Sequence, residues 1–84
     1  MEKVYIIQWL DNDNENICMV GISCVCATLE KAKEELNRIQ KEEQYRCKDY
    51  LKEIIKTDDY MKLIFNDEQT NYIEYNIEEK EILK

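Results

Sequence analysis

Four cysteines are the residues of this chain with the clearest capacity for chemistry. Cys24 and Cys26 are one residue apart, and Cys18 and Cys47 complete a set of four thiols, enough to close a structural zinc site. Such sites usually place Cys-x2-Cys pairs on turns, whereas these cysteines fall within an expected strand and an expected helix. Because free cysteine is among the most buried residue types, we expect reduced thiols that pack as small apolar side chains, with no metal and no cofactor.

An acidic stretch at residues 11–16 is the second candidate for chemistry. Its sequence, Asp-Asn-Asp-Asn-Glu-Asn, carries a carboxylate at every other position, as the first half of a calcium-binding loop does. Such a loop also needs glycine at its sixth position and a bidentate glutamate at its twelfth, where this chain has Asn16 and Ile22. We therefore interpret the stretch as a solvated hairpin turn, which asparagine and aspartate stabilise through bonds to nearby backbone.

The residues that most enzymes need are missing from the sequence. The chain has no histidine, one serine (Ser23) and one glycine (Gly21). It therefore lacks the parts of a nucleophile–base pair, a phosphate-binding loop or a dinucleotide-binding fingerprint. Paired carboxylates are abundant, but an acidic surface supplies such pairs by chance. We expect a protein that is not an enzyme and that acts by binding.

The chain is short, acidic and rich in both apolar and charged residues. Its 84 residues, 44% apolar and 37% charged, predict a single folded domain over residues 1–84 with one modest core. The net charge of −7 disfavours direct contact with nucleic acid and favours a basic partner. The N-terminus has no basic leader and its apolar run is interrupted at Gln8. We therefore expect no membrane span and a location in the cytoplasm.

Two stretches before residue 28 alternate in the manner of β-strands. Residues 3–10 are expected to form the first strand and residues 17–26 the second, joined by the acidic turn. If the second strand is unbroken, one set of its residues faces the core. A glycine within a strand often marks a bulge or a close backbone approach, and a bulge at Gly21 would switch the two sides there. The set expected toward the core consists of Cys18, Val20, Ile22, Cys24 and Cys26.

Residues 28–45 have the clearest helical pattern. Thr28 is suited to cap the start of a helix, and Glu30 suits the positive end of the helix dipole. Apolar residues then recur at steps of three or four, which predicts an amphipathic helix. The apolar stripe consists of Leu29, Ala32, Leu36 and Ile39.

Residues 47–57 carry a second apolar stripe in a different phase. One helix over the whole stretch from 28 to 57 would be roughly 43 Å long, whereas strands of seven to ten residues reach only about 23 to 33 Å. We therefore expect a break near residues 44–47 and a second helix over residues 47–57, with a single protruding helix as the alternative. The second stripe consists of Cys47, Tyr50, Leu51, Ile54 and Ile55.

Two further strands are expected over residues 60–66 and 72–78, with a polar turn between them. The sequence therefore predicts an α+β fold: a four-stranded antiparallel sheet with a helical hairpin, in the order β-β-α-α-β-β. The residues of these two strands expected to point inward are Met61, Leu63, Phe65, Ile73, Tyr75 and Ile77.

Acidic charge is concentrated outside the helical stretch. Residues 30–56 hold seven acids and eight bases, whereas the rest of the chain holds twelve acids and four bases. A helical hairpin would place both polar turns at the same end of the sheet, where their carboxylates would form an acidic rim. Plain solubilising charge is the alternative interpretation. The acidic rim is expected to consist of Asp11, Asp13, Glu15, Asp67 and Glu68.

Tyr72 and Glu74 complete the residues that we expect to bind a partner. Both fall on the outer side of the last strand, which we expect to be an edge strand. Tyrosine is enriched at the centres of protein interfaces, and among the tyrosines of this chain we expect Tyr72 to be the most exposed.

Three segments resemble small acidic α+β proteins encoded by bacteriophages and mobile elements. They are Lys3–Ile7, Thr28–Ala32 at the start of the helix, and Tyr72–Tyr75 in the last strand. That group includes inhibitors of host defence, among them anti-CRISPR proteins, which bind an effector. The resemblance implies an inhibitor of host defence in the cytoplasm of a host bacterial cell. Together with the acidic charge outside the helical stretch and the missing catalytic parts, it leads us to expect a stoichiometric inhibitor that blocks a CRISPR effector or another nucleic-acid-handling host complex through the acidic rim. The alternative is a structural or regulatory module that forms a homodimer through an edge strand or the apolar side of the second helix.

Overall fold

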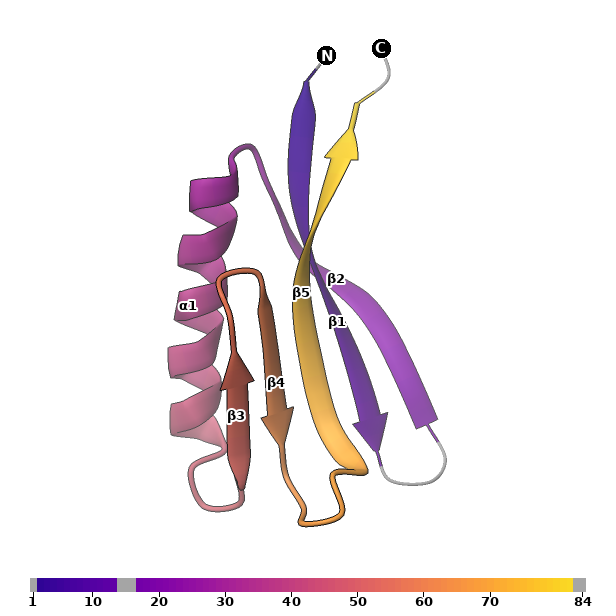
Figure 1. The fold of residues 1–84 in the computed structure, drawn as a ribbon, viewed down its shortest axis with the longest axis vertical. Helices are drawn as coiled ribbons and strands as arrows, with labels where there is room; N and C mark the ends of the chain where they lie inside the picture. Colours follow the sequence, from indigo (N-terminus) through magenta and orange to yellow (C-terminus); the bar gives the residue numbers. More distant parts are fainter. Residues whose placement is uncertain (1, 14–16, 83–84) are drawn as a thin grey trace.

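The structure, a computed structural model, describes residues 2–13 and 17–82, which form five antiparallel strands in one sheet and one helix (Figure 1). In the sheet the strands are ordered β2-β1-β5-β4-β3. β5 is therefore the central strand, and β2 and β3 are the edges. Along the chain the elements are β1 (Lys3–Asp13), β2 (Ile17–Cys26), α1 (Leu29–Arg46), β3 (Glu53–Lys56), β4 (Tyr60–Ile64) and β5 (Asn71–Glu81).

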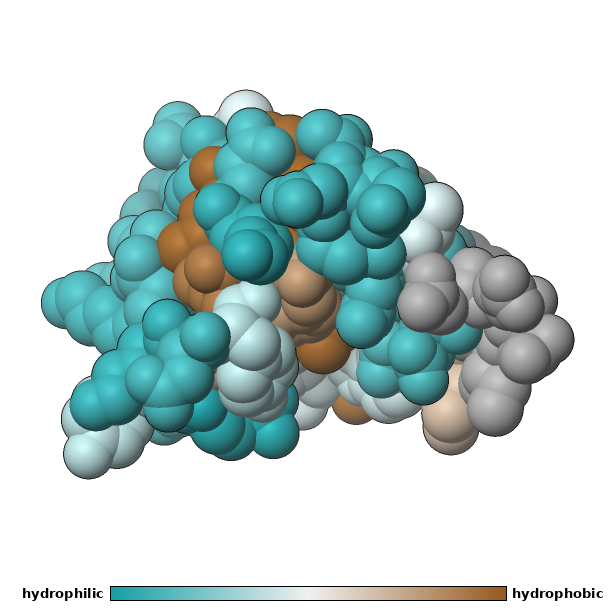
Figure 2. All heavy atoms as spheres, turned by 90° about the horizontal axis from the view of Figure 1, so that it is seen from below, coloured by the Kyte–Doolittle hydropathy of each residue, from teal (hydrophilic) through white to brown (hydrophobic). Residues whose placement is uncertain are grey.

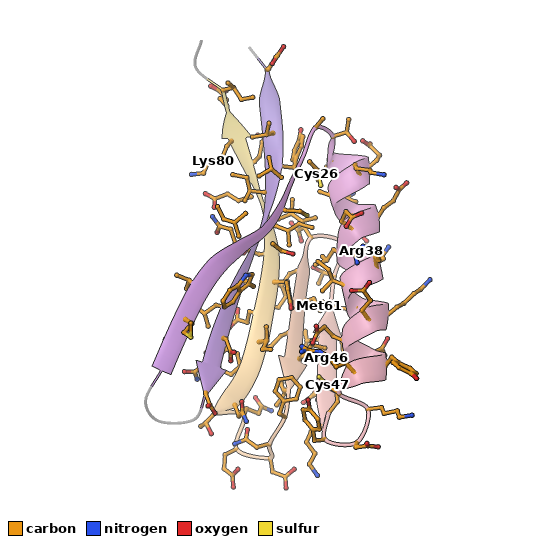
Figure 3. All side chains as sticks on the ribbon, turned by 180° about the vertical axis from the view of Figure 1, so that it is seen from behind. Cys26, Arg38, Arg46, Cys47, Met61 and Lys80 are labelled. Atoms are coloured by element: carbon orange, nitrogen blue, oxygen red, sulfur yellow. The ribbon has the colours of Figure 1, made fainter. Side chains whose placement is uncertain are left out.

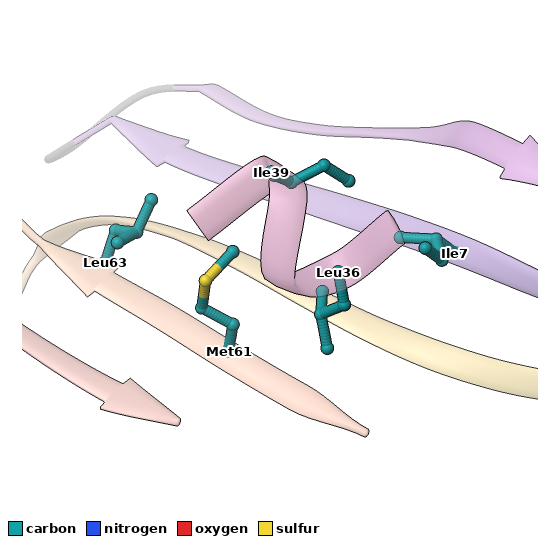
Figure 4. Close-up of a cluster of buried hydrophobic side chains, with 5 residues drawn as sticks. All are labelled: Ile7, Leu36, Ile39, Met61 and Leu63. Carbon is teal, nitrogen blue, oxygen red and sulfur yellow. The ribbon is translucent and has the colours of Figure 1, made fainter. Parts of the chain in front are cut away.

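The core lies between α1 and one face of the sheet. Its buried cluster consists of Ile7 from β1, Leu36 and Ile39 from α1, and Met61 and Leu63 from β4 (Figure 4). Residues that pair directly across antiparallel strands point to the same face. The residues that alternate with this cluster along each strand therefore point to the other face, over which no described element lies (Figure 1).

α1 begins and ends close to where the sequence predicts a helix. The hydroxyl of Thr28 accepts a hydrogen bond from the amide of Lys31 at 3.1 Å, as an N-cap does. Ala32, Leu36 and Ile39 of the expected stripe are buried, so the amphipathic pattern places the helix on the sheet. Within the described residues no helix is both long and apolar enough to cross a membrane.

The second helix expected over residues 47–57 is wrong, and so are the helical hairpin and the four-stranded sheet. α1 ends at Arg46, and the amide of Cys47 donates to the carbonyl of Glu43 at 2.8 Å. The chain then turns and forms β3, which pairs antiparallel with β4. The order of the described elements is therefore β-β-α-β-β-β.

A β-hairpin explains the pattern that resembled a second helix. The amide of Thr57 donates to the carbonyl of Tyr60 at 2.8 Å, which closes a tight turn around Asp58 and Asp59 between β3 and β4. The negative end of a helix would repel these two aspartates, so they predicted where the second helix stops, but aspartate is equally suited to a turn. The β-branched pair at residues 54–55 favours the strand, and pairing with β4 decides the structure.

β2 contains a bulge that changes the face to which its residues point. Ile7 pairs with Cys24, but the next residue, Gln8, pairs with Ile22, so Ser23 is the extra residue in the strand. The strand is therefore not unbroken, and the faces change as expected for a bulge, but at Ser23 and not at Gly21. The residues of the expected inward set that point away from the helix are Cys18, Val20 and Ile22.

Gly21 is a position of close approach rather than the bulge itself. It pairs with Trp9 of β1, and a Cβ atom at Gly21 would lie 2.5 Å from Cζ2 of the Trp9 indole. Its φ angle is not positive. The neighbouring ring, and not the backbone conformation, therefore requires glycine here.

β5 is longer than the strand expected over residues 72–78, and it is not an edge strand. It pairs with β1 from Asn71 opposite Asp13 to Glu81 opposite Lys3, and it pairs with β4 on its other side. The strand expected over residues 60–66 ends earlier, at Ile64. The position of β5 brings the first and last strands of the chain together.

Candidate protein-binding surface

The two edges of the sheet differ in length and in charge. β3 has four residues, of which Glu53 and Lys56 are charged. Short edge strands with charged side chains protect a sheet against pairing with another chain. β2 has ten residues, none of which is charged. β2 is therefore the edge that offers unpaired backbone donors and acceptors to another strand.

Several apolar side chains of β2 are exposed, most of them on one face of the sheet. On the face away from α1, here called the open face, Val20 is 71% exposed, Ile22 60% and Val25 57%. Met19 points to the other face and is also largely exposed. Contiguous exposed apolar residues mark interaction sites, whereas single ones are ordinary. Exposed apolar residues therefore recur along β2, although Cys26 at its end is buried.

A hollow of about 540 Å³ adjoins β2 on the open face. Leu10, Val20 and Ile22 line it from β1 and β2, and Tyr60 and Glu74 line it from β4 and β5. A concave, largely apolar surface with a few polar groups is typical of a binding site. Val20 and Ile22 belong to both the edge and the hollow, which makes them the centre of the candidate surface.

The β4–β5 side of the open face is polar. The hydroxyl of Tyr60 donates to a carboxylate oxygen of Glu74 at 2.9 Å, and burial, followed by this hydrogen bond, raises the pKa of Tyr60 to about 12. The Lys62 ammonium lies 4.2 Å from the centroid of the Tyr72 ring, a cation–π contact. Tyr72 and Glu74, expected on an exposed edge, instead lie half-buried on the central strand with these partners.

The end of β1 and the turn between β4 and β5 lie at the same end of the sheet. Asp13 pairs with Asn71, and the side-chain amide of Asn12 donates to the carbonyl of Thr70 at 2.9 Å. β3, and not a second helix, returns the chain along the sheet to give this arrangement. Figure 2 shows this end, where hydrophilic residues cover most of the surface around a few apolar ones.

Asp67 and Glu68 are exposed on the turn between β4 and β5. The side-chain oxygen of Asn66 accepts hydrogen bonds from the amides of Thr70 and Asn71, each at 3.0 Å. This side chain therefore holds the turn in place and leaves both carboxylates in solvent.

Asp11 and Asp13 lie on β1, at the same end of the sheet as this turn. They line a hollow of about 240 Å³ together with Arg46 at the end of α1, and Arg46 forms an ion pair with Glu43. Arg46 brings a basic group to this end of the sheet, but its ion pair with Glu43 already balances that charge. Glu15 lies outside the described residues. The other six predicted binding residues occupy three places: this hollow, the β4–β5 turn and the open face.

Cys18 is exposed on the open face of β2, contrary to the expectation that the thiols are buried, whereas Cys24 and Cys26 point to the face that carries α1. The sulfur atoms of Cys24 and Cys26 are 3.9 Å apart, and burial, followed by the contact with Cys26, raises the pKa of Cys24 to about 11. Cys26 lies near the start of α1, and Cys47 follows its last residue (Figure 3). The helix has 18 residues and is about 27 Å long, so these two thiols are far apart. In the part of the chain that the structure describes, no three His, Cys, Asp or Glu side chains form a group suited to a metal ion.

Sequence reasoning did not identify β2 as a candidate site, although one signal was present. Residues 16–29 contain no charged residue in a chain that is 37% charged. Alternation along this run predicts one buried side if the strand is unbroken, with a bulge at Gly21 as the alternative. The bulge at Ser23 moves Val20 and Ile22 to the open face, and alternation alone does not reveal such a change of face.

No family model, curated protein or solved structure matches the chain.

Proposed function

We propose that this protein is a non-enzymatic binding protein that accepts a strand of another polypeptide at β2. The observation that carries the proposal is the contrast between the two edges of one sheet. β3 is short and charged, whereas β2 is long, uncharged and exposed on both faces. An added strand satisfies the backbone groups of the edge, and the adjacent side chains determine which strand fits.

The chemistry of β2 also defines the partner strand. Val20 and Ile22 are largely exposed, and full burial of such a side chain contributes about 1.5–3 kcal/mol. A partner strand with few charges and with apolar residues on the open face would bury Val20 and Ile22, and this burial would stabilise the complex. A strongly charged strand would place unpaired charges beside these side chains, which is costly.

Affinity capture with matched variants tests this function. A lysine at Val20 places a charge on the edge and blocks strand addition, whereas Ile55→Lys places the same charge on β3. Both side chains are exposed, so both variants should fold. In capture from the cells that encode the protein, quantified by mass spectrometry, we expect the partner with the wild type and with Ile55→Lys but not with Val20→Lys. Equal capture by all three proteins contradicts the proposal.

The acidic end supports a second candidate function, favoured by the pairing that brings Asp13 to the β4–β5 turn. Here the protein would be a phage-type inhibitor that binds a basic, nucleic-acid-handling host protein, such as a CRISPR effector, in the bacterial cytoplasm. Carboxylates at this end would meet the basic residues that normally hold nucleic acid. Such contacts accelerate association and depend strongly on salt.

Charge reversal tests the second candidate. Lysine is substituted at the rim, and the control carries the same number of reversals at exposed acids of α1 and β5. We expect the rim variant alone to lose inhibition of the effector and the salt dependence of binding. If the rim variant inhibits as the wild type does, this candidate fails. The rim residues to be reversed are Asp11, Asp13, Glu15, Asp67 and Glu68.

A further inference from the structure

We propose that the strand added to β2 is β2 of a second copy of this chain, so that two sheets join into one across a two-fold axis. The inference rests on the proposed function, because it names the occupant of the edge identified there. An antiparallel pair of identical strands has two-fold symmetry, and closed two-fold dimers are the commonest soluble assemblies. The α1 helices of both copies then lie on the same face of the joined sheet.

The charge distribution favours a second copy at β2 over contact at other surfaces. The chain has a net charge of −7, so two copies repel each other wherever their charged surfaces meet. Residues 16–29 are the longest uncharged run of the sequence and include all of β2. Like charges directly opposite each other destabilise a strand pair, and β2 paired with itself has none.

The side chains of β2 complement one another when the two-fold axis passes through Val20. The regular stretch before the bulge, residues 18–22, then pairs with itself, and Val20 meets its own counterpart on the open face. On the other face Met19 of each copy meets Gly21, which has no side chain. The Trp9 ring covers Gly21, so the Met19 sulfur of the second copy lies beside an aromatic ring, a favourable contact.

A disulfide on the axis tests both the pairing and the register. Directly opposite residues of antiparallel strands have Cα atoms about 4.5–5.5 Å apart, within the range of about 4.4–6.8 Å that a disulfide spans. The variant combines Val20→Cys with Cys18→Ser, because Cys18 is the exposed native thiol. Under mild oxidation we expect a covalent dimer whose peptide map links position 20 to position 20.

The matched control combines Ile55→Cys with Cys18→Ser, which places the exposed thiol on β3. It should remain a monomer under the same oxidation. In analytical ultracentrifugation the wild type should have twice the monomer mass, and Val20→Lys, with Ile22→Lys as a second edge variant, should have the monomer mass. Equal cross-linking at positions 20 and 55, or an unchanged mass in both lysine variants, overturns the inference.

The failure of this inference is distinguishable from the failure of the proposed function. A wild-type chain that stays monomeric at high micromolar concentration and forms no dimer through position 20 overturns the second copy as occupant. If affinity capture of another protein is still lost in Val20→Lys, strand addition at β2 stands with a different occupant. If capture is also unaffected by Val20→Lys, the proposed function fails as well.

Discussion

At the scale of single residues, a side chain on the adjacent strand β1 determines which residue fits at position 21 of β2. Gly21 is the only glycine in the chain, and the Trp9 ring occupies the space that a side chain would need there. A glycine within a strand predicts a bulge or a close approach, but the sequence does not distinguish the two. The structure places the close approach at Gly21 and the bulge at Ser23, two residues further on.

Gly21→Ala should destabilise the protein by about 1–3 kcal/mol, the usual cost of inserting a methyl group into occupied space. The measurement is urea unfolding followed by the fluorescence of Trp9, the only tryptophan, whose emission should also shift as the ring moves. Ser23→Ala, at the exposed bulge, is the control and should change the free energy of unfolding little. A Gly21→Ala variant as stable as the wild type would show that the ring does not restrict this position.

Cys24 should react with iodoacetamide more slowly than the exposed Cys18 at pH 8. The thiolate is the reactive form, and burial raises the pKa of Cys24 from 9.0 to about 11. Its rate should therefore rise about tenfold per pH unit between pH 8 and 10. Because the folded state holds this proton more tightly, its contribution to stability is complete below pH 9 and is lost as the pH rises toward 11.

Peptide mapping after timed alkylation measures both rates. Cys24 reacting as fast as Cys18 at pH 8 would show that the buried thiol pair is open to solvent.

At the scale of elements, the length of the pattern determines how well a segment can be predicted from the sequence. α1 combines a capping residue, Thr28, with an apolar stripe sustained over several turns, and its bounds follow from that pattern. β3 has only four residues, and two adjacent isoleucines fit either structure. Pairing with β4 decides between them, and that contact is not visible in local sequence.

Thr28→Ala should destabilise the protein by about 0.5–2 kcal/mol, because the hydroxyl satisfies an amide at the start of α1. Thr28→Ser keeps an equivalent oxygen and should retain most of the stability. Thermal unfolding followed by circular dichroism compares the two variants with the wild type. An equal loss of thermal stability in both variants would show that the methyl group of Thr28, and not its capping hydrogen bond, stabilises the protein.

At the scale of the whole molecule, strand order determines which surfaces exist. The polar turns and the uncharged run can be located in the sequence. The sequence does not reveal that β5 lies between β1 and β4 or that β2 is an edge strand. Strand order also pairs Asp13 of β1 with Asn71 of β5, so the end of β1 and the β4–β5 turn share one end of the sheet. The candidate surface at β2 follows from long-range pairing, so it became visible only in the folded structure.

Hydrogen–deuterium exchange at low and high protein concentration tests most directly that β2 binds a second copy. Outward amides of an unpaired edge strand exchange rapidly, and strand addition protects them. We predict slower exchange in peptides covering residues 17–26 as the concentration rises, no change in residues 53–56, and no concentration dependence in Val20→Lys. Exchange in residues 17–26 that is independent of concentration, or protection that rises equally in β3, would contradict the account.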